Sequence, residues 1–283
     1  MWLWSKHVPA ESEGEWQERL SPLPGFVSEA GGARADRICL QVYTETEQEA
    51  LLLKACYGGR TESVEDRDWV AATAPASTPP LHIRDRLILS GSDDPETLEA
   101  LRAAYPGRAV LSFPAEMAFG TGNHATTATC LRMMCDWVKH RREPWTLTDI
   151  GCGTGVLALA GMRLGAQRAL AFDFDPTAVE IAQRNVERNG GAAGLTLFRA
   201  DVFEWNPAPE DAADLVVVNL FSTVLQRAFP KLKAAMKPDG VLIISGILNT
   251  QAAETLEAAE QAGLRCMQVR KRGKWTTALL ILL

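Results

Sequence analysis

The stretch Asp149-Ile-Gly-Cys-Gly-Thr-Gly155 decides the fold of this chain. An apolar run that suits a strand, Trp145 to Ile150, comes before the glycines. A run with the apolar spacing of a helix buried against a sheet, Val156 to Leu164, follows them. The glycines therefore occupy a strand-to-helix turn. Because glycine has no Cβ atom, the backbone there can turn tightly and a ligand can lie directly on it.

An acidic residue at the end of the next predicted strand narrows the class of ligand. The strand Ala169 to Phe174 delivers Asp173, whose carboxylate can accept hydrogen bonds from both hydroxyls of a ribose. The dinucleotide fingerprint is G-x-G-x-x-G, but Val156 stands here where the third glycine would follow Gly151 and Gly153. This spacing favours an adenosine cofactor without a pyrophosphate, S-adenosylmethionine above all. We therefore expect Gly151, Gly153 and Asp173 to bind cofactor, in a methyltransferase rather than a dehydrogenase.

The order of predicted elements after the glycine turn indicates the architecture. From Trp145 onward the pattern is strand, helix, strand, helix, strand, helix, strand, and the chain closes with a helix and a hairpin. We predict an α/β fold with a doubly wound, mostly parallel seven-stranded sheet, the antiparallel pair lying at its end. The further expected strands are Leu195 to Arg199, Asp214 to Asn219, Gly240 to Ser245, Leu264 to Val269 and Trp275 to Leu282, and the further helices are Pro176 to Asn189 and Thr250 to Ala262.

Composition shifts divide the chain into three parts. Residues 1–70 suit a small α+β domain, with a strand at Arg37 to Tyr43 and a helix at Glu47 to Tyr57. Residues 71–105 begin with a Pro-, Ala- and Thr-rich linker and continue into a bridging segment, in which we expect a strand at Leu81 to Leu89 and a helix at Asp94 to Ala104. Residues 106–283 form the predicted methyltransferase domain.

Composition also limits the class of protein. At 283 residues and 47% apolar residues, the chain can build one large or two modest globular domains. It has no apolar run long enough for a membrane span, its start is too polar for a secretory signal, and its six cysteines and four histidines form no metal-binding pattern. We expect a cytoplasmic protein without metal or membrane. The net charge of −6 argues against direct nucleic-acid binding, although a local basic patch such as Arg265 to Lys274 stays open.

A second motif carries a family resemblance. The segment Phe119-Gly-Thr-Gly-Asn-His-Ala-Thr-Thr127 precedes the glycine turn and resembles the pattern F-G-T-G-T-H-P-T-T of bacterial methyltransferases that modify large-subunit ribosomal protein eleven. The resemblance is dense from about residue 115 to 250 and includes Asp173, Asn219 and Ser245-Gly-Ile-Leu-Asn-Thr-Gln251. It implies a class I methyltransferase domain behind a small substrate-recognition domain. It also implies S-adenosylmethionine as cofactor and lysine and N-terminal amines of that ribosomal protein as substrate.

Position by position, the resemblance assigns cofactor contacts to Thr127, Gly151, Asp173 and Asn219. Asp201 ends the third strand, where methyltransferases of this class hold the adenine amino group, but an exposed acid there can equally be solvated. Asn219 is the candidate catalytic residue, because its side-chain oxygen can accept a hydrogen bond from the substrate amine. His124 is the second candidate, with a capping or packing role as the alternative.

Two departures from the family pattern leave the substrate open. Asn123 and Ala125 flank His124 where the family has Thr and Pro, and Asn219 is followed by Leu-Phe-Ser-Thr223 where the family has an Ile-Leu-Ala-Gly run. The alternatives are a lysine methyltransferase with a different protein substrate, a nicotinamide-type oxidoreductase, and a binding module with a degenerate site. Direct binding of S-adenosylmethionine against NAD, followed by a turnover assay, separates them.

Overall fold

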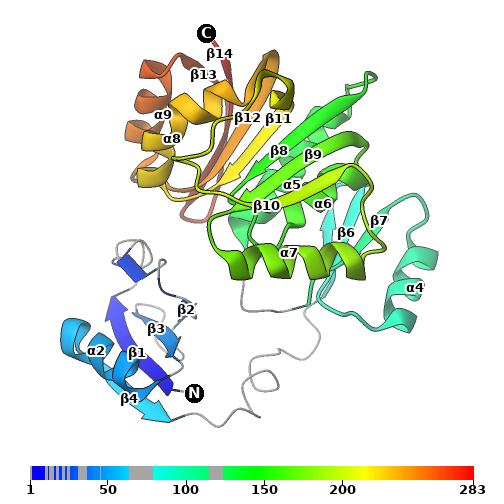
Figure 1. Cartoon of the computed structure of the whole chain (residues 1–283). Helices are drawn as coiled ribbons and strands as arrows, with labels where there is room; N and C mark the ends of the chain where they lie inside the picture. Colours follow the sequence, from blue (N-terminus) through cyan, green and yellow to red (C-terminus); the bar gives the residue numbers. More distant parts are fainter. Residues whose placement is uncertain are drawn as a thin grey trace. The chain divides into compact units, whose positions relative to one another are not determined.

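The computed structural model divides the chain into two compact units, Met1–Ala76 and Ser77–Leu283 (Figure 1). It describes residues 2–9, 12, 16, 19–20, 23, 26–30, 37–44, 46–63, 79–114 and 124–283. Two features of the sequence therefore fall outside the described residues: positions 119–123 of the second motif and positions 71–78 of the linker.

In its described residues, the first unit is an antiparallel sheet with a helix packed on it. The strand order is β2-β3-β1-β4, and β1 pairs along its whole length with β3. Trp4 and Leu40 are fully buried in its core, together with the largely buried Leu53 of the helix. The predicted strand and helix of this unit are both confirmed. The elements are β1 (Trp2–Pro9), β2 (Phe26–Ala30), β3 (Arg37–Thr44), α2 (Glu47–Tyr57) and β4 (Arg60–Ser63).

The second unit is built on a seven-stranded sheet of order β10-β9-β8-β11-β12-β14-β13, as Figure 1 shows. The first five strands are parallel, and β14 pairs antiparallel with both β12 and β13, so the predicted mixed sheet with a terminal hairpin is confirmed. The strands are β8 (Trp145–Ile150), β9 (Ala166–Asp173), β10 (Leu195–Arg199), β11 (Ala213–Asn219), β12 (Met236–Leu248), β13 (Leu264–Arg272) and β14 (Trp275–Leu282).

Helices cover both faces of this sheet, which is the doubly wound arrangement. Alternate residues of β11 point to opposite cores: Leu215 and Val217 pack with α5 and α6, whereas Val216 and Val218 pack with α8 and α9. Helix α7 lies on the α5 and α6 side, because Val186 belongs to the same core as those helices. The helices are α5 (Ala125–Val138), α6 (Val156–Arg163), α7 (Pro176–Arg188), α8 (Ser222–Ala234) and α9 (Ala252–Gln261).

The structure corrects two of the sequence-based expectations. The single strand expected from Leu81 to Leu89 is a hairpin of two strands, β5 (Leu81–Ile83) and β6 (Leu87–Ser90). Arg84 adopts φ 53° in the turn between them, a left-handed conformation that ends a strand. The strict alternation of strands and helices is also wrong after β10, since only a short 3-10 turn, Pro209–Asp211, precedes β11.

A small sheet completes the second unit beside the large one. Its order is β5-β6-β7, with β7 (Ala109–Ser112) parallel to β6 and α4 (Pro95–Ala104) between them in sequence. Asp94 caps α4 as predicted, accepting a hydrogen bond from the Thr97 amide at 2.8 Å. None of the helices in the described parts of the chain is both long and apolar enough to cross a membrane.

Candidate active site

The glycine turn lies between β8 and α6, at the carboxyl edge of the sheet, and is tied to the neighbouring strand. The backbone amides of Gly151 and Cys152 both donate to the Phe172 carbonyl oxygen of β9 at 2.9 Å. Gly151, Gly153 and Gly155 have φ of 71°, 51° and 76°, a region that side chains with a Cβ rarely adopt. These bonds and angles hold the turn against the end of β9, which brings it next to Asp173.

Two buried acidic residues flank the turn. Asp173 accepts hydrogen bonds from the Gly153 amide at 2.9 Å and the Asp175 amide at 3.1 Å. Asp149 accepts one from the Ala158 amide at 2.9 Å, while its other oxygen, Oδ1, has no partner within the described residues. Burial raises the pKa of both carboxyl groups. For Asp149, burial and the negative charge of Asp173 together outweigh the Ala158 hydrogen bond and bring the pKa to about 7.

Asn219 ends β11 beside the same edge and is held by its neighbours. Leu220 follows it and packs over the turn, so that a Cβ on Gly151 would come within 2.6 Å of Leu220 Cδ2. A Cβ on Gly246, which has φ 85°, would come within 2.4 Å of the Leu220 carbonyl oxygen. Glycine is therefore required on both sides of the segment that carries Asn219. Leu220, the first residue of the run that departs from the family pattern, fills the space between these two glycines.

A chain of side-chain hydrogen bonds links Asn219 to the start of α5. Asn219 Nδ2 donates to Thr126 Oγ1 at 3.2 Å and to Thr127 Oγ1 at 3.4 Å. Thr126 Oγ1 lies 2.7 Å from His124 Nδ1, which also accepts from the Thr126 amide and caps the helix. Because His124 Nδ1 accepts from the Thr126 amide, this nitrogen carries no proton, and the Thr126 hydroxyl donates to it. The helix cap is thus His124, and the two threonines lie in the first turn.

The remaining predicted residue, Asp201, lies beyond the end of β10. Its carboxylate is exposed and accepts a hydrogen bond from the Phe203 amide at 2.8 Å. The Ala200 amide donates to the Asp173 carbonyl oxygen at 3.0 Å, which keeps the ends of β9 and β10 together. Four predicted features therefore lie at the carboxyl ends of strands along one edge of the sheet: the glycine turn, Asp173, Asp201 and Asn219. Doubly wound folds bind their ligands at this edge.

This edge fits an adenosine cofactor that carries positive charge. Each oxygen of the Asp173 carboxylate accepts one backbone amide and keeps a second lone pair for a ribose hydroxyl. The unpartnered Oδ1 of Asp149 is a buried acceptor that suits a cationic donor. No side chain of the glycine turn blocks the approach of a ligand to its backbone.

Comparison with protein families decides which cofactor enzyme this is. A family model described as ribosomal protein L11 methyltransferase (PrmA) matches residues 34–280. The chain belongs to the ribosomal protein L11 methyltransferase family. It is therefore a class I methyltransferase, and S-adenosylmethionine is its cofactor, as the glycine turn and Asp173 predicted.

Individual relatives agree with the family. A ribosomal protein L11 methyltransferase of Pelotomaculum thermopropionicum is 38% identical over 215 residues, covering 76% of this chain and 66% of that protein, just under two thirds of its length. One of Symbiobacterium thermophilum is 32% identical over 258 residues, covering 91% of this chain and 79% of that protein. The crystal structure of a ribosomal protein L11 methylase from Lactobacillus delbrueckii subsp. bulgaricus has a TM-score of 0.61 at 23% identity, covering 72% of this chain and 98% of that one, which supports the L11 methyltransferase fold.

Two residues near the site escaped the sequence-based prediction. Asp149 lies two residues before Gly151, and the signal was its place near the end of a buried strand. Trp275 begins β14, and its ring meets the edge of His124 with centroids 5.2 Å apart. No local pattern in the sequence links positions 124 and 275, since the contact depends on the antiparallel pairing of β14 with β12.

Proposed function

We propose that this methyltransferase transfers methyl groups from S-adenosylmethionine to lysine and N-terminal amines of ribosomal protein L11. The observation that carries the proposal is the orientation of Asn219. Its Nδ2 is committed to two threonine hydroxyls, so its Oδ1 is the atom that remains to accept a hydrogen bond from an amine. An acceptor oxygen at the carboxyl edge, beside a cofactor turn, suits an amine substrate.

The chain's own residues hold the cofactor in this proposal. Asp173 binds the ribose hydroxyls, the backbone of Gly151 and Gly153 lies against the ligand, and Asp149 faces its positive charge. Thr127 contributes its hydroxyl from the first turn of α5. Asp201 is assigned to the adenine amino group, from its exposed position after β10.

The proposed catalytic task is to align a neutral amine with the methyl group. When bound, the cofactor supplies a methyl carbon on a positively charged sulfur. A lysine amine with a pKa of about 10.4 is charged at pH 7, and removing its proton costs roughly 4 to 5 kcal/mol. A nearby positive charge and exclusion from water lower that pKa. Asn219 Oδ1 then accepts a hydrogen bond from one of the two N–H groups of the neutral amine, which orients the amine so that its lone pair points to the methyl carbon.

His124 acts in this proposal at the rim of the site. Its Nδ1 is engaged with Thr126, and Thr126 in turn holds the Asn219 amide. His124 therefore fixes the direction of Asn219 through Thr126 and, with Trp275, lines the entrance for the amine.

The first unit is proposed to recognise the protein substrate, as a small domain preceding the methyltransferase domain. The cytoplasm is the location that a ribosomal substrate requires. A different protein lysine is the second candidate substrate, because the residues after Asn219 depart from the family pattern on the substrate side.

The intact mass of unmodified L11 after incubation with enzyme and S-adenosylmethionine tests the proposal. We expect mass to increase in steps of one methyl group, and peptide mapping to locate the groups on lysine and N-terminal amines. Unchanged L11, with cofactor binding intact by calorimetry, would reject L11 as the substrate and leave the second candidate. Wild-type enzyme without cofactor is the control.

A further inference from the structure

Positively charged side chains gather on the surface of the second unit along the C-terminal half of α5. They come from four places: the β5–β6 turn, α5 itself, the loop that follows it, and β13. These four segments contain only three acidic residues, Asp85, Asp136 and Glu143. The chain as a whole has a net charge of −6. We call this surface the α5 basic face, and its cations are Arg84, Arg86, Arg132, Lys139, Arg142, Arg270 and Arg272.

One carboxylate joins two of these cations across the face. Asp136 accepts from Arg84 Nε at 2.8 Å and Nη2 at 2.7 Å, and from Arg270 Nη2 at 2.8 Å. Burial alone would raise the pKa of Asp136, but the bonds from Arg84 and Arg270 lower it. The single negative charge of Asp136 thus brings two guanidinium groups together, and the cluster of three side chains keeps a net positive charge.

Arg132 adds a third guanidinium close to these two. It donates to the Ala128 carbonyl oxygen at 3.0 Å, and no ion pair holds either Arg132 or Arg272 in the described part of the chain. Partial burial lowers the pKa of Arg132, and the positive charges of Arg272 and Arg84 lower it further. The like charges therefore lie close enough to repel one another, which costs stability unless an anion is bound.

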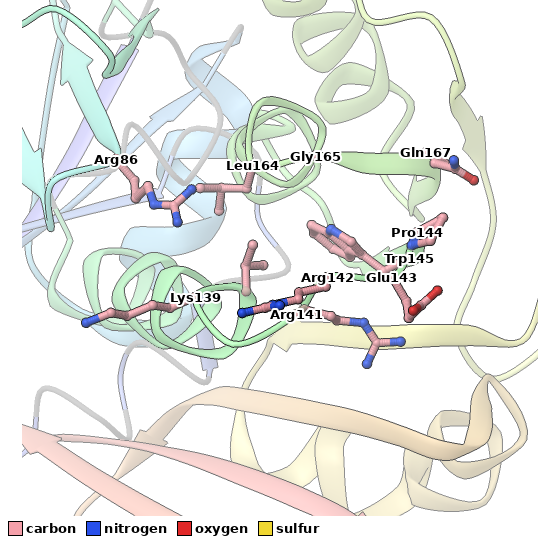
Figure 2. Close-up of a pocket in the computed structure, with 11 residues that line it drawn as sticks. Arg86, Lys139, Arg141, Arg142, Glu143, Pro144, Trp145, Leu164, Gly165 and Gln167 are labelled. Carbon is pink, nitrogen blue, oxygen red and sulfur yellow. The ribbon is translucent and has the colours of Figure 1, made fainter.

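A surface pocket of about 370 Å³ continues the face beyond the end of α5 (Figure 2). Arg86, Lys139 and Arg142 lie around it and are exposed, and none of them has an ion pair among the described residues. Arg141 also lines the pocket but is bound to Asp214, with its side chain stacked on Trp137. The cations that remain for a ligand are therefore the three exposed ones.

From these contacts we propose that the α5 basic face binds the phosphate backbone of RNA. Seven cations distributed over a hairpin turn, a helix, a loop and a strand form a track rather than a point site, which suits a chain of phosphates. Most are arginines, whose planar forks match phosphate oxygens. The net charge of −6 conceals this local excess, and Arg270 and Arg272 belong to the basic patch from Arg265 to Lys274 that the sequence left open.

The choice of RNA among polyanions rests on the proposed function. Ribosomal proteins function together with RNA, so RNA is the phosphate polymer that belongs to the surroundings of the proposed substrate. The accumulation of charge itself does not depend on this choice. An acidic polypeptide is the competing partner, and it enters the test as a separate probe.

Binding on this face is expected to be independent of base sequence. Trp137 lies near the pocket, but the Arg141 guanidinium lies over its ring at 4.6 Å, and Trp145 packs against it in a T-shaped arrangement with ring centroids 5.3 Å apart. Bases therefore find no open aromatic face there on which to stack. Phosphate contacts alone carry affinity without sequence information.

The test compares two triple variants with equal change of charge. Arg86→Gln, Arg142→Gln and Arg272→Gln together remove three unpaired cations of the face. Arg227→Gln, Lys231→Gln and Lys233→Gln remove three from α8, on the other side of the sheet. Fluorescence anisotropy of a labelled single-stranded RNA of mixed sequence, about 20 nucleotides long, is measured over a range of salt concentrations, with polyglutamate as the second probe.

We expect the wild type and the α8 variant to bind this RNA alike. The variant of the α5 basic face should bind at least about tenfold more weakly, with a salt slope smaller by about 2, since each lost phosphate contact removes roughly 0.7. No RNA binding by the wild type at low salt, or equal loss in both variants, overturns the proposal. Tighter binding of polyglutamate than of RNA overturns it in favour of an acidic protein.

Methyl transfer to free L11 is measured on the same proteins. The variant of the α5 basic face should keep wild-type activity, because none of the three residues belongs to the catalytic site. If the wild type binds RNA but does not methylate L11, only the proposed function is contradicted. If the wild type methylates L11 but does not bind RNA, only the proposal of RNA binding is contradicted.

Discussion

Two buried carboxylates, Asp149 and Asp214, lie at opposite edges of the seven-stranded sheet and have opposite surroundings. Asp214, at the amino edge, accepts hydrogen bonds from the Thr146 amide and hydroxyl, from Lys237 Nζ at 2.8 Å and from Arg141. Burial alone would raise its pKa, but these partners lower it. Asp149, at the carboxyl edge, has one partner, a second carboxylate nearby, and a pKa raised to about 7.

The difference distinguishes a carboxylate that stabilises the fold from one that lies at the ligand-binding edge. At the amino edge, the chain supplies all the donors that the carboxylate requires, so Asp214 stabilises the fold. At the carboxyl edge, the chain leaves an acceptor oxygen of Asp149 without a donor and places Asp173 beside it. An unpaired buried acceptor costs stability, and in the proposed function the positive charge of the cofactor offsets that cost. Of these two carboxylates, the one with the incomplete set of donors lies at the ligand edge.

The largest effect is expected from Asp214→Asn. This change leaves Arg141 and Lys237 without their carboxylate, and we expect a loss of about 3 kcal/mol in the free energy of unfolding. Urea unfolding measures it. Asp211→Asn is the matched control, because its pair with Arg168 is partly exposed, and it should cost less than about 1 kcal/mol. Equal losses in the two variants would contradict the structural role of Asp214.

The next effect concerns turnover at the opposite edge. Asn219→Ala removes the proposed acceptor for the amine and should lower kcat about 10²- to 10³-fold at saturating cofactor. Thr126→Val should lower it by about tenfold, since the Asn219 amide loses its hydroxyl partner, whereas Thr126→Ser should keep most activity. Methyl transfer assays compare the three. Unchanged kcat in Asn219→Ala would remove Asn219 from the catalytic role.

The pH dependence of stability also distinguishes the two carboxylates. Below the ordinary value of 3.8, Asp149 is protonated in both the folded and the unfolded state; between 3.8 and about 7 only the unfolded state loses the proton. Stability should therefore fall as pH rises through this window, by at most about 1.4 kcal/mol per pH unit. Asp149→Asn should have a shallower slope than the wild type in urea unfolding without cofactor, and the raised pKa of Asp173 leaves a remainder of the same sign.

Asp214 should behave in the opposite way. Its pKa is lowered in the folded state, so its contribution is complete above the ordinary value and is lost as pH falls below about 4. A pH profile of Asp214→Asn against the wild type should therefore converge at low pH. A difference that persists undiminished there would contradict the pairing described for Asp214.

The smallest effect is expected from Asp201→Ala. Its carboxylate is exposed, and it already accepts a hydrogen bond from its own turn, so the contact proposed with adenine is screened by water. We expect cofactor affinity to fall by about threefold or less. A loss of cofactor affinity as large as that of an Asp173 variant would contradict this minor role and make Asp201 a principal cofactor contact.

Local patterns predicted the main parts of the fold and the cofactor turn. Glycines at positive φ, continuous apolar strands and an N-cap such as Asp94 act within a few residues, so the sequence contains their whole cause. The hairpin at Arg84 was hidden because an apolar run on both sides resembles one strand. Two features depend on contacts between elements far apart in the sequence, which no single stretch specifies. They are the ring contact between His124 and Trp275 and the absence of a hydrogen-bond partner for Asp149 Oδ1 among the described residues.

The affinity for S-adenosylmethionine of the wild type, Asp173→Ala and Asp214→Asn, measured by calorimetry, tests the comparison most directly. We predict that Asp173→Ala binds about 10²- to 10⁴-fold more weakly, because two hydrogen bonds to a charged acceptor are lost. Asp214→Asn should bind like the wild type wherever it is folded. Near-normal affinity in Asp173→Ala, or a comparable loss in folded Asp214→Asn, would contradict the assignment of the cofactor to the carboxyl edge.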